Sequence, residues 1–215
     1  MRQVKVCELV YDYTMYPRAS IDSYHVSEIV QAMTAGLEMP PVVIDKATKR
    51  IVDGFHRCTA ALRCHDTDAT IMVVEKTYRS EQQMFLDAVR YNSAHGRNLS
   101  TYDRARCAIQ AANLEIDDAL LAGVLHMDVE AIDKLRRHRS AMAGKLTVPI
   151  KRTIQHKAGK SLTRGQITAN EALGGMNQLF YVNQLIILIE NELLDTANEL
   201  LMARLSYLAK LLEEI

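Results

Sequence analysis

The sequence lacks a long hydrophobic run, a surplus of either charge and any pair of closely spaced cysteines. No stretch of 18 apolar residues occurs in the 215 positions, so no membrane-spanning helix and no membrane partner are expected. The first residues contain no apolar segment typical of a secretory signal. Tryptophan is absent, and only 9 glycines and 4 prolines are present, which excludes collagen-like and low-complexity chains. The composition is that of a globular protein.

The four cysteines, Cys7, Cys58, Cys64 and Cys107, form no CxxC motif. A disulfide framework is typical of shorter, cysteine-dense secreted chains, and a zinc site needs ligands at close, paired spacing. Metal ligation at Cys64 and His65 is the less favoured alternative to ordinary thiols. A reducing, cytoplasmic location is therefore expected.

The charges balance, with 26 basic and 26 acidic residues. No global electrostatic field then attracts nucleic acid, and any binding must come from a local patch.

The order of patterns predicts an α+β protein. Residues 1–80 alternate strand and helix signals and are expected to form a small α/β domain. Residues 81–140 carry helical periodicity, with Ser100 and Asp103 resembling a capping box. The region 141–215 is expected to be helical and to mediate oligomerisation, so that the chain is predicted to be helical from residue 81 onward.

A strand that runs into a glycine turn and directly into a helix, over residues 51–62, is the first candidate site. Backbone N–H groups at such a helix start suit an anion, above all phosphate. Arg57 lies outside the apolar pattern, so its removal is expected to leave the fold intact. A plain turn with surface side chains is an equally weighted alternative. The candidate phosphate-binding residues are Gly54, His56, Arg57 and Thr59.

A helix break at residues 91–101 is the second candidate. Its amide, imidazole and guanidinium groups are suited to phosphate, although such residues also occur commonly in solvated turns. The residues expected to close the site from this side are Asn92, His95 and Arg97.

The order of these pieces resembles that in the ParB/sulfiredoxin-like superfamily. The residues that carry the resemblance are Gly36, the expected strand 41–44 and the segment 51–57. In ParB partition proteins a G-E-R-R signature binds the phosphates of CTP, and Gly54-Phe55-His56-Arg57 keeps its first and last residues. The resemblance implies a small ParB-like domain followed by a helix-turn-helix domain. It also implies a nucleoside triphosphate, with CTP first, and Mg²⁺ for which Asp53 is a weak candidate ligand.

Two enzyme branches share that fold. Sulfiredoxin carries a reactive cysteine where this chain has Phe55, so sulfinate reduction is not expected. Free-serine kinases carry D-G-H-T-R, of which this chain keeps the aspartate, glycine and arginine. An enzyme such as a small-molecule kinase or a nucleotide hydrolase, with Asp53 or His56 as general base, therefore stays the alternative function.

Residues 117–139 fit two short helices with a coherent apolar set, as in a helix-turn-helix. The second helix ends in four cations, which attract DNA phosphates. Its first turns carry Asp128, Glu130 and Asp133, which repel them. An adaptor helix pair whose cations complement the helix dipole is the alternative. The predicted DNA-binding residues are Lys134, Arg136, Arg137 and Arg139.

Apolar residues recur at three- and four-residue steps over residues 184–215. This stripe predicts a helix that buries one side, either within the chain or against a second copy. Self-association is the favoured interpretation. Together these features predict a ParB-like, nucleotide-responsive DNA-binding protein of the partition or transcription-regulator type. A further alternative is an interaction protein with a vestigial nucleotide pocket.

Overall fold

The computed structural model divides into two compact units, Met1–Met176 and Asn177–Ile215. The residues that it describes are 1–65, 68–94, 98–172, 182, 185–186, 188–189 and 194–213. The boundaries predicted at residues 80 and 140 both fall inside the first unit, so each unit is described by itself.

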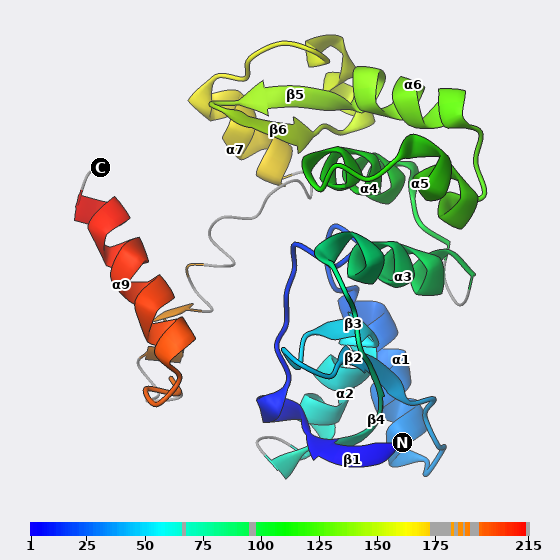
Figure 1. The fold of residues 1–215 in the computed structure, drawn as a ribbon, viewed down its shortest axis with the longest axis vertical. Coiled ribbons are helices and arrows are strands. Elements are labelled where there is room, and N and C mark those ends of the chain that lie inside the picture. The colour runs from blue at the N-terminus through cyan, green and yellow to red at the C-terminus, as the bar shows by residue number, and fades with distance from the viewer. Residues whose placement is uncertain are drawn as a thin grey trace. The chain divides into compact units, whose positions relative to one another are not determined.

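The first unit begins with strands and helices in alternation (Figure 1). The elements are β1 (Arg2–Lys5), η1 (Val6–Glu8), α1 (Ser23–Thr34), β2 (Val42–Asp45), β3 (Ile51–Asp53), α2 (Phe55–His65) and β4 (Thr70–Lys76). The sheet has the order β1-β4-β2-β3. Strand β4 runs parallel to β2 and antiparallel to β1, while β2 and β3 are antiparallel. Val42 and Ile44 of β2 are fully buried, which explains the continuous apolar run of that strand.

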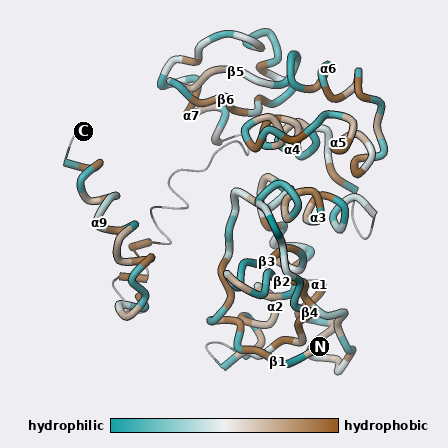
Figure 2. The backbone as a smooth tube through the Cα atoms, in the orientation of Figure 1, coloured by the Kyte–Doolittle hydropathy of each residue, from teal (hydrophilic) through white to brown (hydrophobic). Residues whose placement is uncertain are grey.

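Helices follow: α3 (Glu81–Ala94), α4 (Thr101–Asn113), α5 (Asp118–Leu125) and α6 (Val129–Arg139). Their apolar faces share one core, to which Val43 and Val52 of the sheet also contribute. Figure 2 shows apolar stretches on these helices interrupted by polar ones, as expected for helices that bury one side. The predicted α+β class is confirmed.

Local signals in the sequence set several helix ends. The Asp22 side chain accepts hydrogen bonds from two backbone N–H groups at the start of α1, and Gly36 follows the end of α1 with a φ of 80°. The capping box predicted at Ser100 and Asp103 is present at the start of α4.

The prediction that the chain is helical throughout after residue 81 is wrong at residues 140–149. Strands β5 (Ser140–Ala143) and β6 (Leu146–Pro149) form an antiparallel hairpin there. The hairpin is closed by a two-residue turn in which Gly144 has a φ of 62°. The strands are short and contain few β-branched residues, so no alternating pattern marks them. The elements η3 (Arg152–Lys157) and α7 (Arg164–Ala172) complete this part.

In the second unit, α9 (Glu199–Glu213) is described. Asn198 precedes it, and the Asn198 side chain accepts a hydrogen bond from the Leu201 N–H. None of its residues is buried. Other parts of the predicted stripe, such as residues 190–193, lie outside the described residues. Across the described parts of both units, no helix combines the length and the apolar character needed to cross a bilayer.

Candidate functional site

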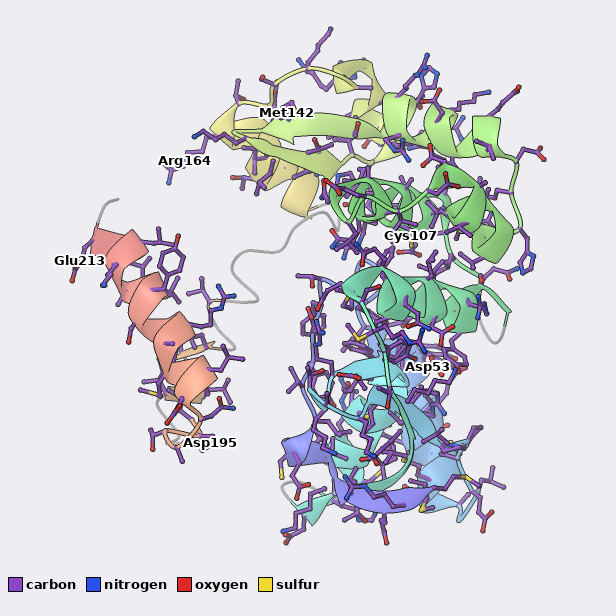
Figure 3. The ribbon with its side chains drawn as sticks, viewed as in Figure 1. Asp53, Cys107, Met142, Arg164, Asp195 and Glu213 are labelled. Carbon is purple, nitrogen blue, oxygen red and sulfur yellow. The ribbon has the colours of Figure 1, made fainter. Side chains whose placement is uncertain are left out.

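A cavity of about 920 Å³ opens in the first unit where the β3–α2 turn faces α3 and α4. Its walls come from the segment 16–25, the loop 39–41 and the turn 53–57, together with residues of α3 and the start of α4. Figure 3 labels Asp53 at this turn, below α3. Three predicted site residues of the turn, Gly54, His56 and Arg57, line the cavity together with the predicted Asn92.

The backbone conformation at residue 54 and its close approach to β2 both require a glycine. Its φ is 113°, a conformation that side chains with a Cβ rarely adopt. A Cβ at this position would lie 2.6 Å from Cγ2 of Val42, in the neighbouring strand. The glycine therefore lets α2 begin directly at the edge of the sheet, where the first N–H groups of the helix have no partner within the helix.

Arg57 is engaged in the fold. Its guanidinium donates hydrogen bonds of 2.6 and 2.8 Å to the carbonyl oxygens of Pro40 and Pro41. It also pairs with the Asp53 carboxylate at 2.6 Å. These contacts attach the loop before β2 to the start of α2, whereas the expectation that the fold stays intact without Arg57 remains a prediction. The sequence could not reveal the contacts because carbonyl acceptors carry no side-chain signature.

His56 lines the cavity as a neutral ring. Its Nε2 atom accepts a hydrogen bond of 3.1 Å from the Asp22 backbone N–H, which places the proton of the neutral ring on Nδ1, 3.5 Å from the Tyr16 hydroxyl. Burial, aided by the nearby charges of His25, Arg18 and Arg57, lowers the pKa of His56 to about 4. His56 thus positions the start of α1 rather than supplying a cation.

Two further predicted residues of the turn have local partners. The Thr59 hydroxyl donates to the Phe55 carbonyl oxygen, one turn back along α2, and Thr59 lies outside the set that lines the cavity. Asp53 lines the cavity, with its carboxylate already paired to Arg57. Within the described residues no group of three or more His, Cys, Asp or Glu side chains could hold a metal. A Mg²⁺ ion at Asp53 would therefore depend on phosphate oxygens for its other ligands.

The second predicted motif is present in part. Asn92 is buried, its Oδ1 accepts a 3.0 Å hydrogen bond from Arg18 Nε, and its Nδ2 donates to the Ala88 carbonyl oxygen. His95 and Arg97 lie outside the described residues, so their part in the site stays a prediction.

The start of α4 contributes groups that the sequence analysis missed. Oδ1 of Asp103 accepts a 2.8 Å hydrogen bond from the Ala19 N–H, while its Oδ2 accepts from the N–H and the hydroxyl of Ser100. Lys151 also lines the cavity, and its amine lies 3.9 Å from the centre of the Tyr102 ring. The capping pattern pointed to Asp103, but nothing local indicated its contact with a residue 84 positions earlier.

Neither Phe55 nor Cys58 offers a reactive group here. Phe55 is buried, and its ring stacks on Tyr16 with the ring centres 4.3 Å apart. Cys58 is fully buried, and burial raises the pKa of its thiol to about 12. A thiolate is thus disfavoured at Cys58, the cysteine nearest in the sequence to the β3–α2 turn.

The predicted helix pair corresponds to α5 and α6, joined by residues 126–128. Arg136 pairs with Asp118 of α5 and donates to the Ala108 carbonyl oxygen of α4, so it holds the three helices together. Arg137 is exposed and pairs with Asp133 along its own helix. Lys134 is exposed and Arg139 half-buried. Of the four predicted DNA contacts, Arg136 is thus half-buried and bonded to two neighbouring helices of the fold.

No family model matches the sequence. Two curated proteins are similar to part of it. The "Streptomycin biosynthesis operon possible regulatory protein" of Streptomyces griseus is 34% identical over 83 residues, 39% of this chain and 23% of that protein. The "Transcriptional regulator NovG" of Streptomyces niveus is 36% identical over 73 residues, 34% of this chain and 22% of that protein. The chain spans less than a quarter of the length of either relative.

Three of the similar solved structures are of ParB proteins or domains. The C-terminally truncated chromosome-partitioning protein ParB from Caulobacter crescentus, complexed to the centromeric parS site, has a TM-score of 0.45 and 13% identity over 64% of this chain and 71% of its own. The same protein complexed with CTP-gamma-S has a TM-score of 0.38 and 13% identity, and the match covers 63% of this chain and 76% of that one. A Pnob8-like ParB-N domain has a TM-score of 0.40 and 12% identity, and the match covers 62% of this chain and 61% of that one. The chain is thus similar to ParB proteins, as the motifs predict, at 12 to 13% sequence identity.

Proposed function

We propose that the protein is a DNA-binding regulator or partition protein of the ParB-like type that responds to a nucleotide. The observation that carries the proposal is the outer surface of α6, where Lys134, Arg137 and His138 are exposed on a helix packed against α4 and α5. A helix of this kind fits the major groove of duplex DNA. The names of the two curated relatives, a possible regulatory protein and a transcriptional regulator, support the same class.

The charges along α6 favour contact with the DNA backbone. Acidic residues lie at its start, and the cations gather in its last turn. Because phosphate contacts carry no sequence information directly, we expect modest discrimination between specific and random duplexes.

Replacing Lys134 and Arg137 together with alanine is expected to weaken duplex binding. Each lost phosphate contact lowers the slope of log affinity against log salt concentration by about 0.9. Fluorescence anisotropy over a salt series measures both quantities. Arg136 is left in place because its contacts with Asp118 stabilise the helix pair.

The matched control is the double variant Lys46→Ala/Arg63→Ala, which removes two exposed cations from the α/β part of the unit. The proposal predicts that this control binds like the wild type. Equal binding by all three proteins would contradict a contact through α6.

The cavity supports the nucleotide part of the proposal. Its volume of about 920 Å³ lies within the range of small-molecule sites, roughly 300–1,000 Å³. Arg18, Arg57 and Lys151 line it together with the start of α2, and these groups suit phosphates. CTP is the first nucleotide to test, because the similar Caulobacter crescentus protein is complexed with CTP-gamma-S. Mg²⁺ would be shared between the phosphates and Asp53.

Titration calorimetry with CTP, ATP and GTP in the presence of Mg²⁺ tests this site. Lys151→Ala removes one lining cation and is expected to weaken binding by roughly tenfold, the worth of one charge-assisted hydrogen bond. Lys145→Ala is the control, because Lys145 belongs to the neighbouring hairpin and does not line the cavity. Absence of heat with all three nucleotides would contradict the proposal.

The geometry favours binding over catalysis at this turn. Asp53 is paired with Arg57, and both ring nitrogens of His56 face partners. A histidine whose pKa is about 4 is also a weak general base at neutral pH.

The described part of the C-terminal unit supports self-association. Along α9, Leu200 is 72% exposed and Leu212 is 61% exposed, although both belong to the apolar stripe. A second copy of the chain covering this stripe would bury them. Light scattering of the full chain and of a chain ending before residue 184 tests the proposal, which predicts a smaller assembly after truncation.

A further inference from the structure

The basic residues of this chain are concentrated in one segment. Between Asp133 and Glu171 the sequence has ten lysines and arginines and no acidic residue. The whole chain has 26 residues of each sign, so the remaining sequence is acidic by ten charges. Only the first four cations belong to α6. The other six follow it, in the part of the chain that folds as the β5–β6 hairpin, η3 and the start of α7.

This hairpin segment, residues 140–172, has its own small core of Ala141, Val148, Ile150 and Leu162. Strand β5 has a neighbour on both sides. On one side it pairs with β6, and on the other the Met142 N–H donates to the Lys160 carbonyl oxygen at 2.9 Å. The segment is therefore a packed element that holds its surface cations in defined positions.

The hairpin segment is also attached directly to the end of α6. The Ile150 N–H donates a 2.8 Å hydrogen bond to the Arg139 carbonyl oxygen, and the Ser140 hydroxyl donates to the Arg136 carbonyl oxygen. Strand β5 begins at the residue after α6 ends. The cations of the helix and those of the hairpin segment are consequently carried by elements that are joined directly to each other.

Three exposed cations of the hairpin segment lie apart from the acidic side chains of the described residues. Lys145 is at the tip of the hairpin, Lys160 lies beside β5, and Arg164 begins α7. Figure 3 shows the Arg164 side chain projecting outward and labels Met142 on β5. Within the described part of the chain, no carboxylate lies within ion-pairing distance of these three cations. In contrast, Arg136 and Arg137 of α6 each pair with an aspartate.

We propose that Lys145, Lys160 and Arg164 bind the phosphate backbone of duplex DNA beside the groove that α6 enters. The inference rests on the proposed DNA-binding function and adds a second contact surface to it. Duplex DNA carries one negative charge per roughly 1.7 Å of its axis, so exposed cations on a segment joined directly to the groove-binding helix meet further phosphates. A two-stranded β-ribbon is also among the elements that bind in or along a groove.

The contact supplies affinity rather than sequence preference. The three side chains, two of lysine and one of arginine, are exposed, and phosphate contacts fix position without reading bases. The hairpin segment thus compensates for the acidic first turns of α6, which reduce the electrostatic attraction of the helix itself.

The experiment compares three proteins on a random-sequence duplex of about 30 base pairs, at salt concentrations from about 50 to 200 mM. The test variant is Lys145→Ala/Lys160→Ala/Arg164→Ala. The matched control is Lys46→Ala/Arg63→Ala/Arg79→Ala, which removes three exposed cations from elsewhere in the same unit. Thermal melting checks that both variants are folded, which is expected because none of the six side chains belongs to a buried cluster.

The test variant is expected to lose roughly 10- to 100-fold in affinity at about 100 mM salt, with a log–log slope lower by up to about 2.7, while the control stays near wild type. Wild-type affinity and slope in the test variant, alongside weakened binding by Lys134→Ala/Arg137→Ala, would overturn this inference and leave the proposed function intact. An equal loss in the control would also overturn it. If the wild type binds no duplex even at low salt, the proposed function falls together with the inference.

Discussion

Replacing Gly54 with alanine is expected to lower the free energy of unfolding by about 3 to 5 kcal/mol. Two costs combine at this position. The φ of 113° is unfavourable for any residue with a side chain, and the new methyl group would meet Val42 at 2.6 Å. Val42 is fully buried in the central part of the sheet, so it has little room to move. Urea denaturation of the full chain measures the change.

Gly36→Ala is the control that separates the two costs. Gly36 has a φ of 80°, but an added Cβ would meet nothing within 4 Å. Its substitution is therefore expected to cost only the backbone term, about 1 to 2 kcal/mol. If both variants lose the same stability, the close approach between the turn and β2 does not contribute. Val42→Ala in the Gly54→Ala background is expected to restore part of the loss specific to that contact.

Replacing Arg57 with alanine is expected to lower the free energy of unfolding by about 3 kcal/mol. The substitution leaves the carbonyl oxygens of Pro40 and Pro41 without their donor and removes the partner of Asp53. The Arg57 side chain is 16% exposed, so water replaces these bonds incompletely. The loss is expected to appear in thermal or urea unfolding without any nucleotide present.

Arg63→Ala is the matched control for Arg57, since Arg63 lies in the last turn of the same helix and is exposed. It is expected to change stability by less than about 0.5 kcal/mol. A folded Arg57→Ala protein with unchanged stability would show that the loop before β2 is held by other contacts. Loss of nucleotide binding in such a protein would then assign Arg57 to the phosphates directly.

Features with local causes were predictable from the sequence. The Ser100–Asp103 capping box and the glycine stop at residue 36 depend on neighbours within a few positions, and both are present. The turn at Gly54 was also recognised as a strand–glycine–helix junction. These features are set by backbone conformation and by nearby hydrogen bonds, which short sequence patterns encode.

Features set by distant contacts were not predictable. Arg57 and Arg136 were both assigned to ligands, whereas the first binds carbonyl oxygens 16 and 17 residues earlier and the second pairs with Asp118. An arginine side chain can bind a ligand at the surface or a partner within the fold, and the sequence pattern around it is the same in both cases. The hairpin after α6 was missed because its short strands resemble a linker.

The packing of Phe55 on its tyrosine neighbours gives this protein a spectroscopic reporter at the β3–α2 turn. Rings held rigidly in an asymmetric environment produce a near-ultraviolet circular dichroism signal, which disappears when fixed packing is lost. The chain has no tryptophan, so tyrosine and phenylalanine bands are not overlaid by indole absorption. Tyr11, Tyr13 and Tyr16 all pack against Phe55, the first residue of α2. Loosening of this turn is therefore expected to reduce the near-ultraviolet dichroism to which these four rings contribute, separately from the helix content reported in the far ultraviolet.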